Sequence, residues 1–443
     1  MNLSIPSGCA CGREHPAFHS RVVTGSGVLR QLPELVRSLG GHKVFLLADT
    51  HTDEAAGAQV CDLLTAAGMP YHRCILTADP LHPDESTVGS AVMHYTTDCD
   101  VIVSAGSGVL NDTGKILANL TGHPYVIVGT APSMDGYASA SSSMDRDGLK
   151  VSLPSKCADV ILGDTDILCK APAEMLAAGL GDMLAKYISI CEWRIAHIIT
   201  GEYYCEAVAE MVREALAECM AHADGLLRRE PAAVEAVFRG LVIGGAAMYF
   251  AGVSRPASGV EHYFSHLMDM RALEFGLPAR LHGIQCAAGT LRALELYAQM
   301  RKITPDRAKA LGHARKFRYD AWAQELRRFL GRGAEAMIAL EAKEGKYDLA
   351  AHENRLNIIL ARWDDILAVM DEELPPVDEI RALLAKLDIP PVEQMGLDGA
   401  KAAVAFCATR DIRDKYVLSR LAWDLGVTEE ITERTNHHDK TYP

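Results

Sequence analysis

"VIVSAGSGVLNDTGK", residues 101–115, is the stretch that decides the fold of this chain. It begins as an apolar, β-branched run, passes through Gly106, Ser107 and Gly108, and continues in a pattern typical of a helix. A strand that leads through a short turn into a helix indicates a βαβ unit. Glycines let the backbone approach a ligand closely, and the free amides at a helix start favour a phosphate group. The turn lacks the pattern G-x-G-x-x-G, so plain turn chemistry is the alternative.

Similar apolar runs recur through the first 165 residues. They are bounded by Gly, Asp or Pro and separated by amphipathic segments, which indicates a largely parallel sheet. After residue 165 nearly every segment has a helical pattern. We therefore predict a Rossmann-like α/β domain over residues 1–165 and an all-α domain over residues 166–443, with a cleft between them. The further predicted strands are residues 43–49, 73–76, 125–130 and 158–164.

A second loop, "VGTAPSMDGYASASSSM" at residues 128–144, also follows a predicted strand. It is rich in small hydroxyl residues around Met134, Asp135 and Gly136. Ligands of open α/β sheets bind at the carboxyl ends of the strands, so we expect both loops to line the same crevice. A flexible surface loop is the alternative explanation.

The helical segments contain residues that suit a metal ion. In "GVEHYFSHLMDM", residues 259–270, His262 and His266 are four residues apart and project from one face of a helix. Asp182 stands in an apolar helical run, and His282 stands at the start of another helix. A carboxylate and two imidazoles with an open position form a catalytic site for zinc or a related divalent ion. Each residue alone is explained as well by a core, capping or ion-paired position, but their combination favours a metal.

Composition limits the classes of function. The chain has 443 residues, more than the ~250–300 at which a single core stops growing, so two domains are expected. Its net charge of −14 argues against general binding to nucleic acids or membrane surfaces. Twelve cysteines without framework spacing, and a start without secretory features, predict a reducing cytoplasm. The apolar run at 240–253 is shorter than the ~20 residues that span a bilayer, so we interpret it as a buried helix without membrane insertion.

Five motifs together give the chain a specific resemblance. "GSGVLND", "TAPSMDGYAS", "GLGDMLAKY", "SRPASGVEHYFSH" and "LHGIQ" occur in the order and setting seen in sn-glycerol-1-phosphate dehydrogenases. These enzymes belong to the superfamily of iron-containing alcohol dehydrogenases, glycerol dehydrogenases and dehydroquinate synthases. The resemblance covers nearly the whole chain, including the late "EGKYD" and "IRDKYVLSRLAWDLG", and implies a dehydroquinate synthase-like fold.

The resemblance implies roles at individual positions. Asp182, His262 and His282 match the three metal ligands, and Asp182 also matches a residue that touches substrate. Asp135 and His266 match residues that bind and orient the substrate, so Asp182, His266 and Asp135 are the predicted catalytic residues. The predicted cofactor contacts, of which the first five match the segment that holds the NAD pyrophosphate, are Gly106, Ser107, Gly108, Val109, Leu110, Thr130, Ala131, Pro132, Ser133 and Ser139.

The implied reaction interconverts dihydroxyacetone phosphate and sn-glycerol 1-phosphate by hydride transfer at C2, with NAD or NADP. A divalent ion, zinc or nickel with iron as a further candidate, would act as a Lewis acid on the C2 oxygen. Asp49 ends a predicted strand, and a carboxylate there favours the ribose 2′-hydroxyl of NAD over the 2′-phosphate of NADP. His266 is expected to relay a proton near neutral pH, and Arg255 is a candidate phosphate contact from its charge and position. The family generally associates, so we expect a homo-oligomer, a dimer or larger, acting on a small phosphorylated polyol.

Two departures from the family pattern adjoin the metal-binding motifs. Related enzymes commonly have Glu where this chain has Ile284, and that difference bears on the support of the ligands and on metal choice. The spacing from His262 to His282 is also longer than in compact relatives, consistent with an insertion around residues 270–279. That insertion bears on the identity of the substrate.

Three alternatives remain open. The nearest is another member of the superfamily, either a glycerol dehydrogenase acting on unphosphorylated polyol or a lyase resembling dehydroquinate synthase. A metallohydrolase usually places Glu directly after the first histidine of such a pair, whereas Tyr263 follows His262 here. A non-catalytic metal-binding protein would use "CACGREH", in which Cys9, Cys11 and His15 could bind a metal. The sequence shows no fourth ligand for these three, and a surface turn explains them as well.

Overall fold

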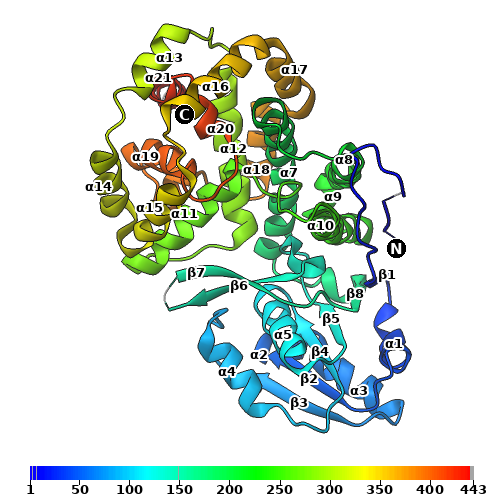
Figure 1. The fold of residues 1–443 in the computed structure, drawn as a ribbon. Helices are drawn as coiled ribbons and strands as arrows, with labels where there is room; N and C mark the ends of the chain where they lie inside the picture. The colour runs from blue at the N-terminus through cyan, green and yellow to red at the C-terminus, as the bar shows by residue number, and fades with distance from the viewer. Residues whose placement is uncertain (2, 6, 148, 440–443) are drawn as a thin grey trace. The chain divides into compact units, whose positions relative to one another are not determined.

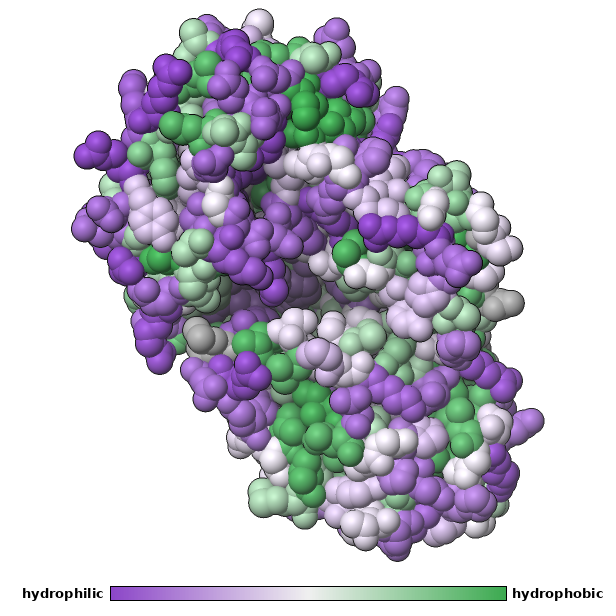
Figure 2. Space-filling view, in the orientation of Figure 1, coloured by the Kyte–Doolittle hydropathy of each residue, from purple (hydrophilic) through white to green (hydrophobic). Residues whose placement is uncertain are grey.

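The computed structural model describes residues 1, 3–5, 7–147 and 149–439. Packing divides the chain into two compact units. Unit 1 contains residues Met1–Met183 and Ala207–Val253, and unit 2 contains Leu184–Glu206 and Ser254–Pro443. Hydrophilic side chains cover much of the visible face of the molecule, interrupted by smaller hydrophobic areas (Figure 2).

Unit 1 is built on a parallel sheet of six strands in the order β1-β8-β5-β4-β2-β3 (Figure 1). β4, β5 and β8 are buried along their whole length because their Val, Ile and Leu side chains pack against helices on the two faces. Since all six strands are parallel, their carboxyl ends lie at one edge of the sheet. The strands are β1 (Arg21–Gly25), β2 (Val44–Asp49), β3 (Tyr71–Leu76), β4 (Val101–Gly106), β5 (Tyr125–Gly129) and β8 (Val160–Asp164).

Short helices connect these strands, and a hairpin follows β5. The hairpin pairs β6 (Ser141–Arg146) with β7 (Leu149–Pro154) in antiparallel register. The connecting helices are η1 (Val28–Gln31), α1 (Leu32–Ser38), α2 (Thr50–Thr52), η2 (Asp53–Gly57), α3 (Ala58–Ala66), α4 (Glu85–His94), α5 (Gly108–Thr121) and η3 (Asp135–Ala138), and α6 (Thr165–Leu168) follows the last strand.

Three later helices also belong to unit 1. They are α8 (Glu206–Ala221), α9 (Ala223–Leu226) and α10 (Pro231–Ala251). α10 packs against η3, and Gly129 and Gly163 leave room for its Phe238 ring, which lies within 3 Å of where a Cβ would stand at either glycine. Among the described residues α10 alone is long and apolar enough to cross a membrane, but 78% of its most apolar window is buried inside the protein. The prediction that this apolar run is a buried helix is confirmed.

Unit 2 is helical throughout its described residues. Its first element is α7 (Ala173–Thr200), a continuous helix that begins in unit 1 and passes from Met183 into Leu184 without a break. The remaining helices are α11 (Val260–Phe275), α12 (His282–Met300), α13 (Arg307–Ala314), α14 (Tyr319–Leu330), η4 (Gly331–Gly333), α15 (Ala334–Glu344), α16 (Leu349–Ala361), α17 (Trp363–Glu373), α18 (Val377–Lys386), η5 (Val392–Met395), α19 (Ala400–Thr409), α20 (Leu418–Asp424) and α21 (Thr428–Asp439).

The predicted α/β region followed by an all-α region is confirmed, with the change from strand to helix at Asp164 and Thr165. The five predicted strands all form, within two residues of their expected bounds. Packing, however, does not divide the chain at residue 165, because α8, α9 and α10 bury their apolar faces within unit 1. The sequence boundary therefore describes the secondary structure and does not describe the compact units.

Candidate active site

The glycine turn after β4 has the geometry of an anion-binding helix start. Gly106 ends β4, and Ser107 precedes the first residue of α5 without making a side-chain cap hydrogen bond. A Cβ at Gly106 would lie 2.4 Å from Cδ1 of Leu110, so only glycine fits between the strand and the helix. The amides of the first turn of α5 therefore lack a side-chain cap from Ser107 and suit a phosphate group.

The second loop lies directly beside this turn. The Thr130 amide donates to the Gly106 carbonyl at 3.1 Å, and the Ser133 hydroxyl donates to Oγ of Ser107 at 3.1 Å. Pro132 presses against α7, where a Cβ at Gly179 would stand 1.7 Å from the Pro132 carbonyl oxygen. Both loops therefore lie side by side at the carboxyl ends of β4 and β5.

A buried lysine on α5 holds the second loop in place by hydrogen bonds. Lys115 on α5 is fully buried, and its Nζ donates to the Gly136 carbonyl at 3.2 Å, Oγ of Ser139 at 3.1 Å and the Ser141 carbonyl at 2.5 Å. It also pairs with Asp112 at 2.8 Å. The Ser139 hydroxyl, predicted as a cofactor contact, is thus engaged in holding the loop. The sequence signal for Lys115 is a cation on the apolar side of a helix, where it needs buried partners.

Asp49 ends β2, the strand next to β4 in the sheet. One of its oxygens accepts a hydrogen bond from the Thr52 amide at 2.7 Å, and its own amide donates to Oγ1 of Thr52 at 3.0 Å. This capping box fixes the carboxylate at the start of α2. An acidic group at this strand end is in the position from which a dinucleotide ribose is bound in related α/β sheets.

Asp182 connects the second loop to α7. Its side chain is fully buried, and Oδ2 accepts a hydrogen bond from the Asp135 amide at 2.9 Å. Asp135, the predicted substrate residue, begins η3 and is partly exposed. The position of Asp135 therefore depends on the same carboxylate that is predicted to hold the metal.

Two histidines on neighbouring helices, α11 and α12, face one another. The ring centroids of His262 and His282 lie 5.0 Å apart. Nδ1 of His262 lies 2.8 Å from Oε1 of Glu261, a carboxylate that can only accept when ionised. Nδ1 of His262 then carries the proton, and its Nε2 presents a lone pair. A carboxylate that orients a metal-binding imidazole in this way is common in metal sites.

The tautomer of His282 follows from a chain of hydrogen bonds. The amide of Gln285 donates to Oδ1 of Asp269 at 2.9 Å, which turns its carbonyl oxygen toward Ser265. The Ser265 hydroxyl donates to that oxygen at 2.7 Å, so it must accept from Nδ1 of His282 at 3.0 Å. Nε2 of His282 is left with the lone pair. The neighbouring Ile284 is buried, and His282 is supported through Ser265 and Gln285.

The predicted metal ligands gather in one group. One ligand atom each from Asp182, His262, His282 and Cys286 lies within 4.8 Å of all the others. Asp182 stands on α7 a single turn before Lys186, and the helix runs on unbroken to Thr200. One carboxylate oxygen, two imidazole nitrogens with lone pairs and a nearby thiol form a donor set that fits a divalent transition metal.

Cys286 was not predicted from the sequence. It follows His282 by four residues on α12, so both side chains lie on one face of that helix. Its Sγ lies 3.5 Å from Nε2 of His282, the nitrogen that is available to a metal. The i, i+4 spacing of His and Cys was the only signal that could have found it.

His266 is partly buried on α11, and its ring centroid lies 6.5 Å from that of His282. Burial, together with the neighbouring rings of His282 and His262, holds the pKa of His266 well below its usual value. The imidazole is therefore neutral at physiological pH. A proton relay that titrates near neutrality does not fit this environment, whereas a neutral hydrogen-bonding partner for a hydroxyl group does.

Arg255 does not face a ligand, which corrects its prediction as a phosphate contact. Its side chain is 1% exposed, and Nε and Nη2 donate to the two carboxylate oxygens of Glu202. Nη1 donates to the Tyr416 carbonyl at 2.9 Å. The guanidinium thus holds two segments of unit 2 together, and a motif position alone could not distinguish this role from anion binding.

Two buried carboxyl groups and one partly buried lysine with shifted pKa values lie at the start of α11. Burial, and then repulsion from Glu261, raise the pKa of Glu192 to about 8, and burial raises the pKa of Glu261 to about 7. Burial, and then Arg255, lower the pKa of Lys415 to about 7. Oε1 of Glu261 also accepts from the Gly259 amide at 2.7 Å, which fixes the carboxyl group beside His262. Sequence reasoning missed Glu261 because adjacent helical residues do not normally face one ligand.

Replacing Glu261 with glutamine tests this support. The amide oxygen of Gln can still accept from Gly259 and from His262, so the fold should remain, but the negative charge that Glu261 places beside the imidazole is lost. We expect the affinity of this site for a divalent ion to fall by about 10–100-fold. Competition against a fluorescent zinc chelator measures this affinity, with Glu335→Gln, an exposed residue on α15, as the control. Unchanged affinity in Glu261→Gln would show that this carboxylate does not tune His262.

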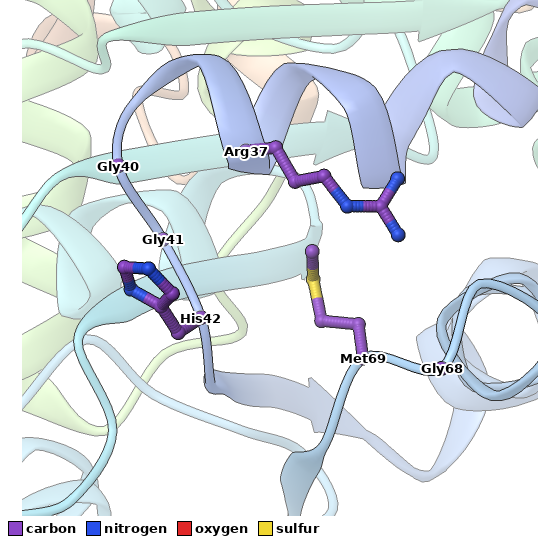
Figure 3. A pocket seen from close by; sticks show the side chains of 6 residues that line it. All are labelled: Arg37, Gly40, Gly41, His42, Gly68 and Met69. Carbon is purple, nitrogen blue, oxygen red and sulfur yellow. The ribbon is translucent and has the colours of Figure 1, made fainter.

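A surface pocket of about 330 Å³ is unrelated to these residues (Figure 3). It lies before the amino ends of β2 and β3, at the edge of the sheet opposite the two loops. Its lining residues are Arg37, Gly40, Gly41, His42, Gly68 and Met69. None of the predicted site residues contributes to it.

Comparisons with known proteins agree with this geometry. The family model described as "Iron-containing alcohol dehydrogenase" matches residues 23–172. The glycerol-1-phosphate dehydrogenase (NAD(P)+) of Halalkalibacterium halodurans is 34% identical over 297 residues, which cover 66% of this chain and 74% of that protein. The enzyme of the same name from Methanosarcina mazei is 31% identical over 314 residues, covering 68% and 86%.

Solved structures of lower identity share the fold. A glycerol dehydrogenase from Schizosaccharomyces pombe superposes with a TM-score of 0.59 at 14% identity, covering 97% of this chain and 94% of that one. An iron-containing alcohol dehydrogenase from Thermococcus thioreducens gives a TM-score of 0.59 at 14% identity, covering 95% and 99%. These similarities support the α/β sheet followed by helices as a fold common to all three proteins.

Proposed function

The chain belongs to the iron-containing alcohol dehydrogenase superfamily and, within it, to the glycerol-1-phosphate dehydrogenases, and from this premise we propose that it interconverts dihydroxyacetone phosphate and sn-glycerol 1-phosphate with NAD(H) or NADP(H). Hydride is transferred at C2 of the substrate. The observation that carries this proposal is the donor group of Asp182, His262 and His282, in which both histidines present Nε2 lone pairs.

Each part of the site has a role in this reaction. Asp182, His262 and His282 would hold a divalent ion, which when bound supplies Lewis-acid chemistry to the reacting oxygen. The amides at the start of α5 and the hydroxyls of Thr130 and Ser133 would bind the dinucleotide phosphates. Asp135, held by Asp182, would orient the polyol, and the neutral imidazole of His266 would accept or donate a hydrogen bond to a substrate hydroxyl.

The ion is proposed to be zinc or nickel, with iron as the further candidate, because a carboxylate with two imidazoles suits several divalent metals. The nearby Cys286 thiol adds a soft donor that zinc tolerates well. Elemental analysis of the unsubstituted protein and of His262→Ala, both purified without added metal, identifies this ion as the one that the variant loses. We also propose that the enzyme acts in the cytoplasm as a homo-oligomer, and light scattering of the purified chain measures its association.

The direct test is NADH oxidation by metal-loaded protein with dihydroxyacetone phosphate. The proposal predicts rapid turnover with this substrate and formation of sn-glycerol 1-phosphate. A coupled enzyme that is specific for one enantiomer of glycerol phosphate identifies the product. Dihydroxyacetone and glycerol, which lack the phosphate, should react far more slowly. Comparable turnover of unphosphorylated polyol would instead indicate a glycerol dehydrogenase, and formation of the opposite enantiomer would contradict the proposal.

Cofactor choice is tested at Asp49. We expect the enzyme to prefer NADH, and Asp49→Ser to reduce the preference for NADH over NADPH by about tenfold, roughly 1.4 kcal/mol. Serine can still cap α2, so the substitution removes the charge and keeps the local fold. Asp84→Ser is the matched control, because Asp84 caps α4 in the same way through the Thr87 amide at 2.9 Å. A strong NADPH preference of the unsubstituted enzyme would refute the role of Asp49.

A further inference from the structure

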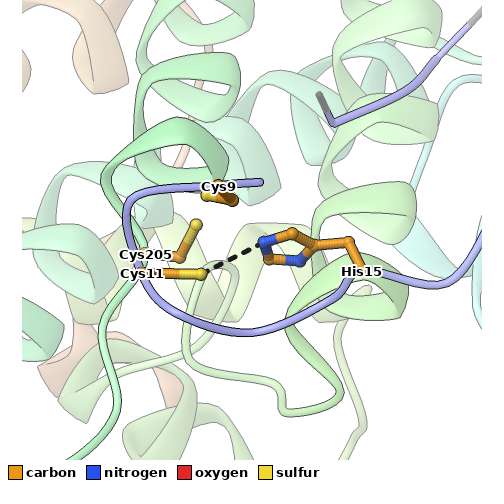
Figure 4. A group of neighbouring side chains, drawn as sticks. All are labelled: Cys9, Cys11, His15 and Cys205. Atoms are coloured by element: carbon orange, nitrogen blue, oxygen red, sulfur yellow. Dashed lines mark hydrogen bonds between the residues drawn. The ribbon is translucent and has the colours of Figure 1, made fainter. Parts of the chain in front are cut away.

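A second group of metal-binding side chains lies apart from the candidate active site (Figure 4). One ligand atom each from Cys9, Cys11, His15 and Cys205 lies within 4.8 Å of all the others. Figure 4 shows the three sulfur atoms and the imidazole of His15 directed toward one common point. Sγ of Cys11 lies 3.3 Å from Nε2 of His15. The sequence had supplied three of these donors, and the structure adds the fourth.

Local backbone structure brings the donors together. The Gly12 amide donates to the Cys9 carbonyl at 3.0 Å, which closes a tight turn around Cys9 and Cys11. Gly8 and Gly12 flank this turn with φ of +75°, a conformation that strongly favours glycine. Cys205 is buried and immediately precedes α8, so the rigid start of that helix holds its thiol.

The orientation of His15 is fixed independently of the thiols. Its Nδ1 lies 2.9 Å from the carbonyl oxygen of Phe250 in α10. A carbonyl only accepts hydrogen bonds, so Nδ1 carries the proton and Nε2 directs its lone pair toward the sulfur atoms. A histidine that ligates a metal characteristically donates its other ring N–H to a backbone carbonyl or a carboxylate.

The donor set is that of a closed zinc site. Three cysteines and one histidine give the Cys₃His set of structural zinc, with four protein ligands and no open position. With Zn–S near ~2.3 Å and Zn–N near ~2.0–2.1 Å, tetrahedral geometry places the ligand atoms about 3.5–3.8 Å from one another. The Cys11–His15 separation of 3.3 Å is slightly shorter than this range, and the other ligand atoms lie within 4.8 Å of one another, so small side-chain movements would reach the geometry of a loaded site. None of the twelve cysteines, all within the described residues, forms a disulfide.

We propose that Cys9, Cys11, His15 and Cys205 bind a structural zinc ion that fixes the N-terminal segment to the start of α8. His15 extends this attachment to the end of α10 through Phe250. α10 packs against η3, which carries Asp135. The zinc site therefore stabilises the helix that contacts the second loop, and it takes no part in the chemical reaction. The inference does not depend on the reaction proposed above, since it uses different residues.

Metal content separates the two sites. Protein purified under reducing conditions should contain two metal ions per chain, and His262→Ala should retain one of them. Cys9→Ser/Cys11→Ser should lose the other and keep the ion at Asp182, His262 and His282. Cys169→Ser, a partly exposed cysteine of unit 1 outside both groups, is the matched control and should retain two. A single ion per chain that disappears entirely in His262→Ala would overturn the proposal.

Cobalt spectroscopy gives a readout that does not require the cysteine variants to be stable. His262→Ala loaded with Co²⁺ should show the thiolate-to-cobalt charge-transfer band and the intense visible bands of tetrahedral coordination, and Cys286→Ser in that background should keep them. In the unsubstituted protein, alkylation of Cys9 and Cys11 should be slow until a chelator removes zinc, then rise at least tenfold. Rapid alkylation before chelation, or a disulfide among these cysteines in reduced preparations, would contradict a zinc site.

Discussion

Replacement of Asp182 with asparagine is expected to lower kcat/KM for dihydroxyacetone phosphate reduction by at least about 10³-fold. A divalent ion that acts as a Lewis acid stabilises the transition state by several kcal/mol. Each 1.36 kcal/mol corresponds to about a factor of ten in rate. The asparagine amide oxygen can still accept the hydrogen bond from the Asp135 amide, which is 2.9 Å from Oδ2 in the native side chain. The fold should therefore persist while the charged ligand is lost.

Steady-state kinetics and elemental analysis on the same preparations measure this effect. The variant should lose the ion of the candidate active site and retain a native melting transition. Asp62→Asn, an exposed aspartate on α3 of unit 1, is the control and should retain full activity and metal content. If Asp182→Asn kept its activity and its ion, Asp182 would not be a ligand.

Gly179→Ala should produce the largest loss of stability among the substitutions considered. A Cβ at this position would stand 1.7 Å from the carbonyl oxygen of Pro132 and 3.0 Å from Cγ1 of Val237. The carbonyl belongs to the backbone of the second loop, so α7 and the loop must separate. We expect the free energy of unfolding to fall by roughly 3 kcal/mol, the upper end of typical overpacking costs, and KM for NADH to rise as the loop moves.

Urea-induced unfolding, followed by circular dichroism, measures this loss. Gly89→Ala is the matched control, because Gly89 lies within α4 and no heavy atom lies within 4 Å of the point where its Cβ would stand. There alanine should raise stability by up to about 1 kcal/mol through helix propensity. Equal stability of Gly179→Ala and the unsubstituted protein would show that the loop does not depend on close contact with α7.

Much of the fold follows from local sequence patterns. The buried strands β2, β4, β5 and β8 are continuous apolar runs that end at Gly or Asp, and such runs are recognisable without a structure. β6, with the sequence SSSMDR, has no apolar run, and its pairing with β7 depends on tertiary contacts. β1 is a five-residue strand at the edge of the sheet, and its apolar run is too short to be recognised as a strand from the sequence.

The candidate site was predictable only in part. The spacing of His262 and His266 and the resemblance to a family pointed to the metal ligands, but neither indicates which residues orient the rings. Ser265 and Gln285 acquire that role from the packing of α11 against α12, whereas Glu261 orients His262 from the adjacent position on α11. Cys205 is 190 residues from His15 in sequence, so only the folded chain places it beside the N-terminal cysteines. The error at Arg255 has a similar origin, because Glu202, its partner, lies 53 residues away.

The most direct test of the central claim is an anomalous difference map from a crystal of the active, metal-loaded enzyme. The account predicts a strong peak bonded to Asp182 and to Nε2 of both His262 and His282, at about 2.0–2.2 Å. A map without density among these three side chains, from protein that turns over dihydroxyacetone phosphate at full rate, would contradict the account.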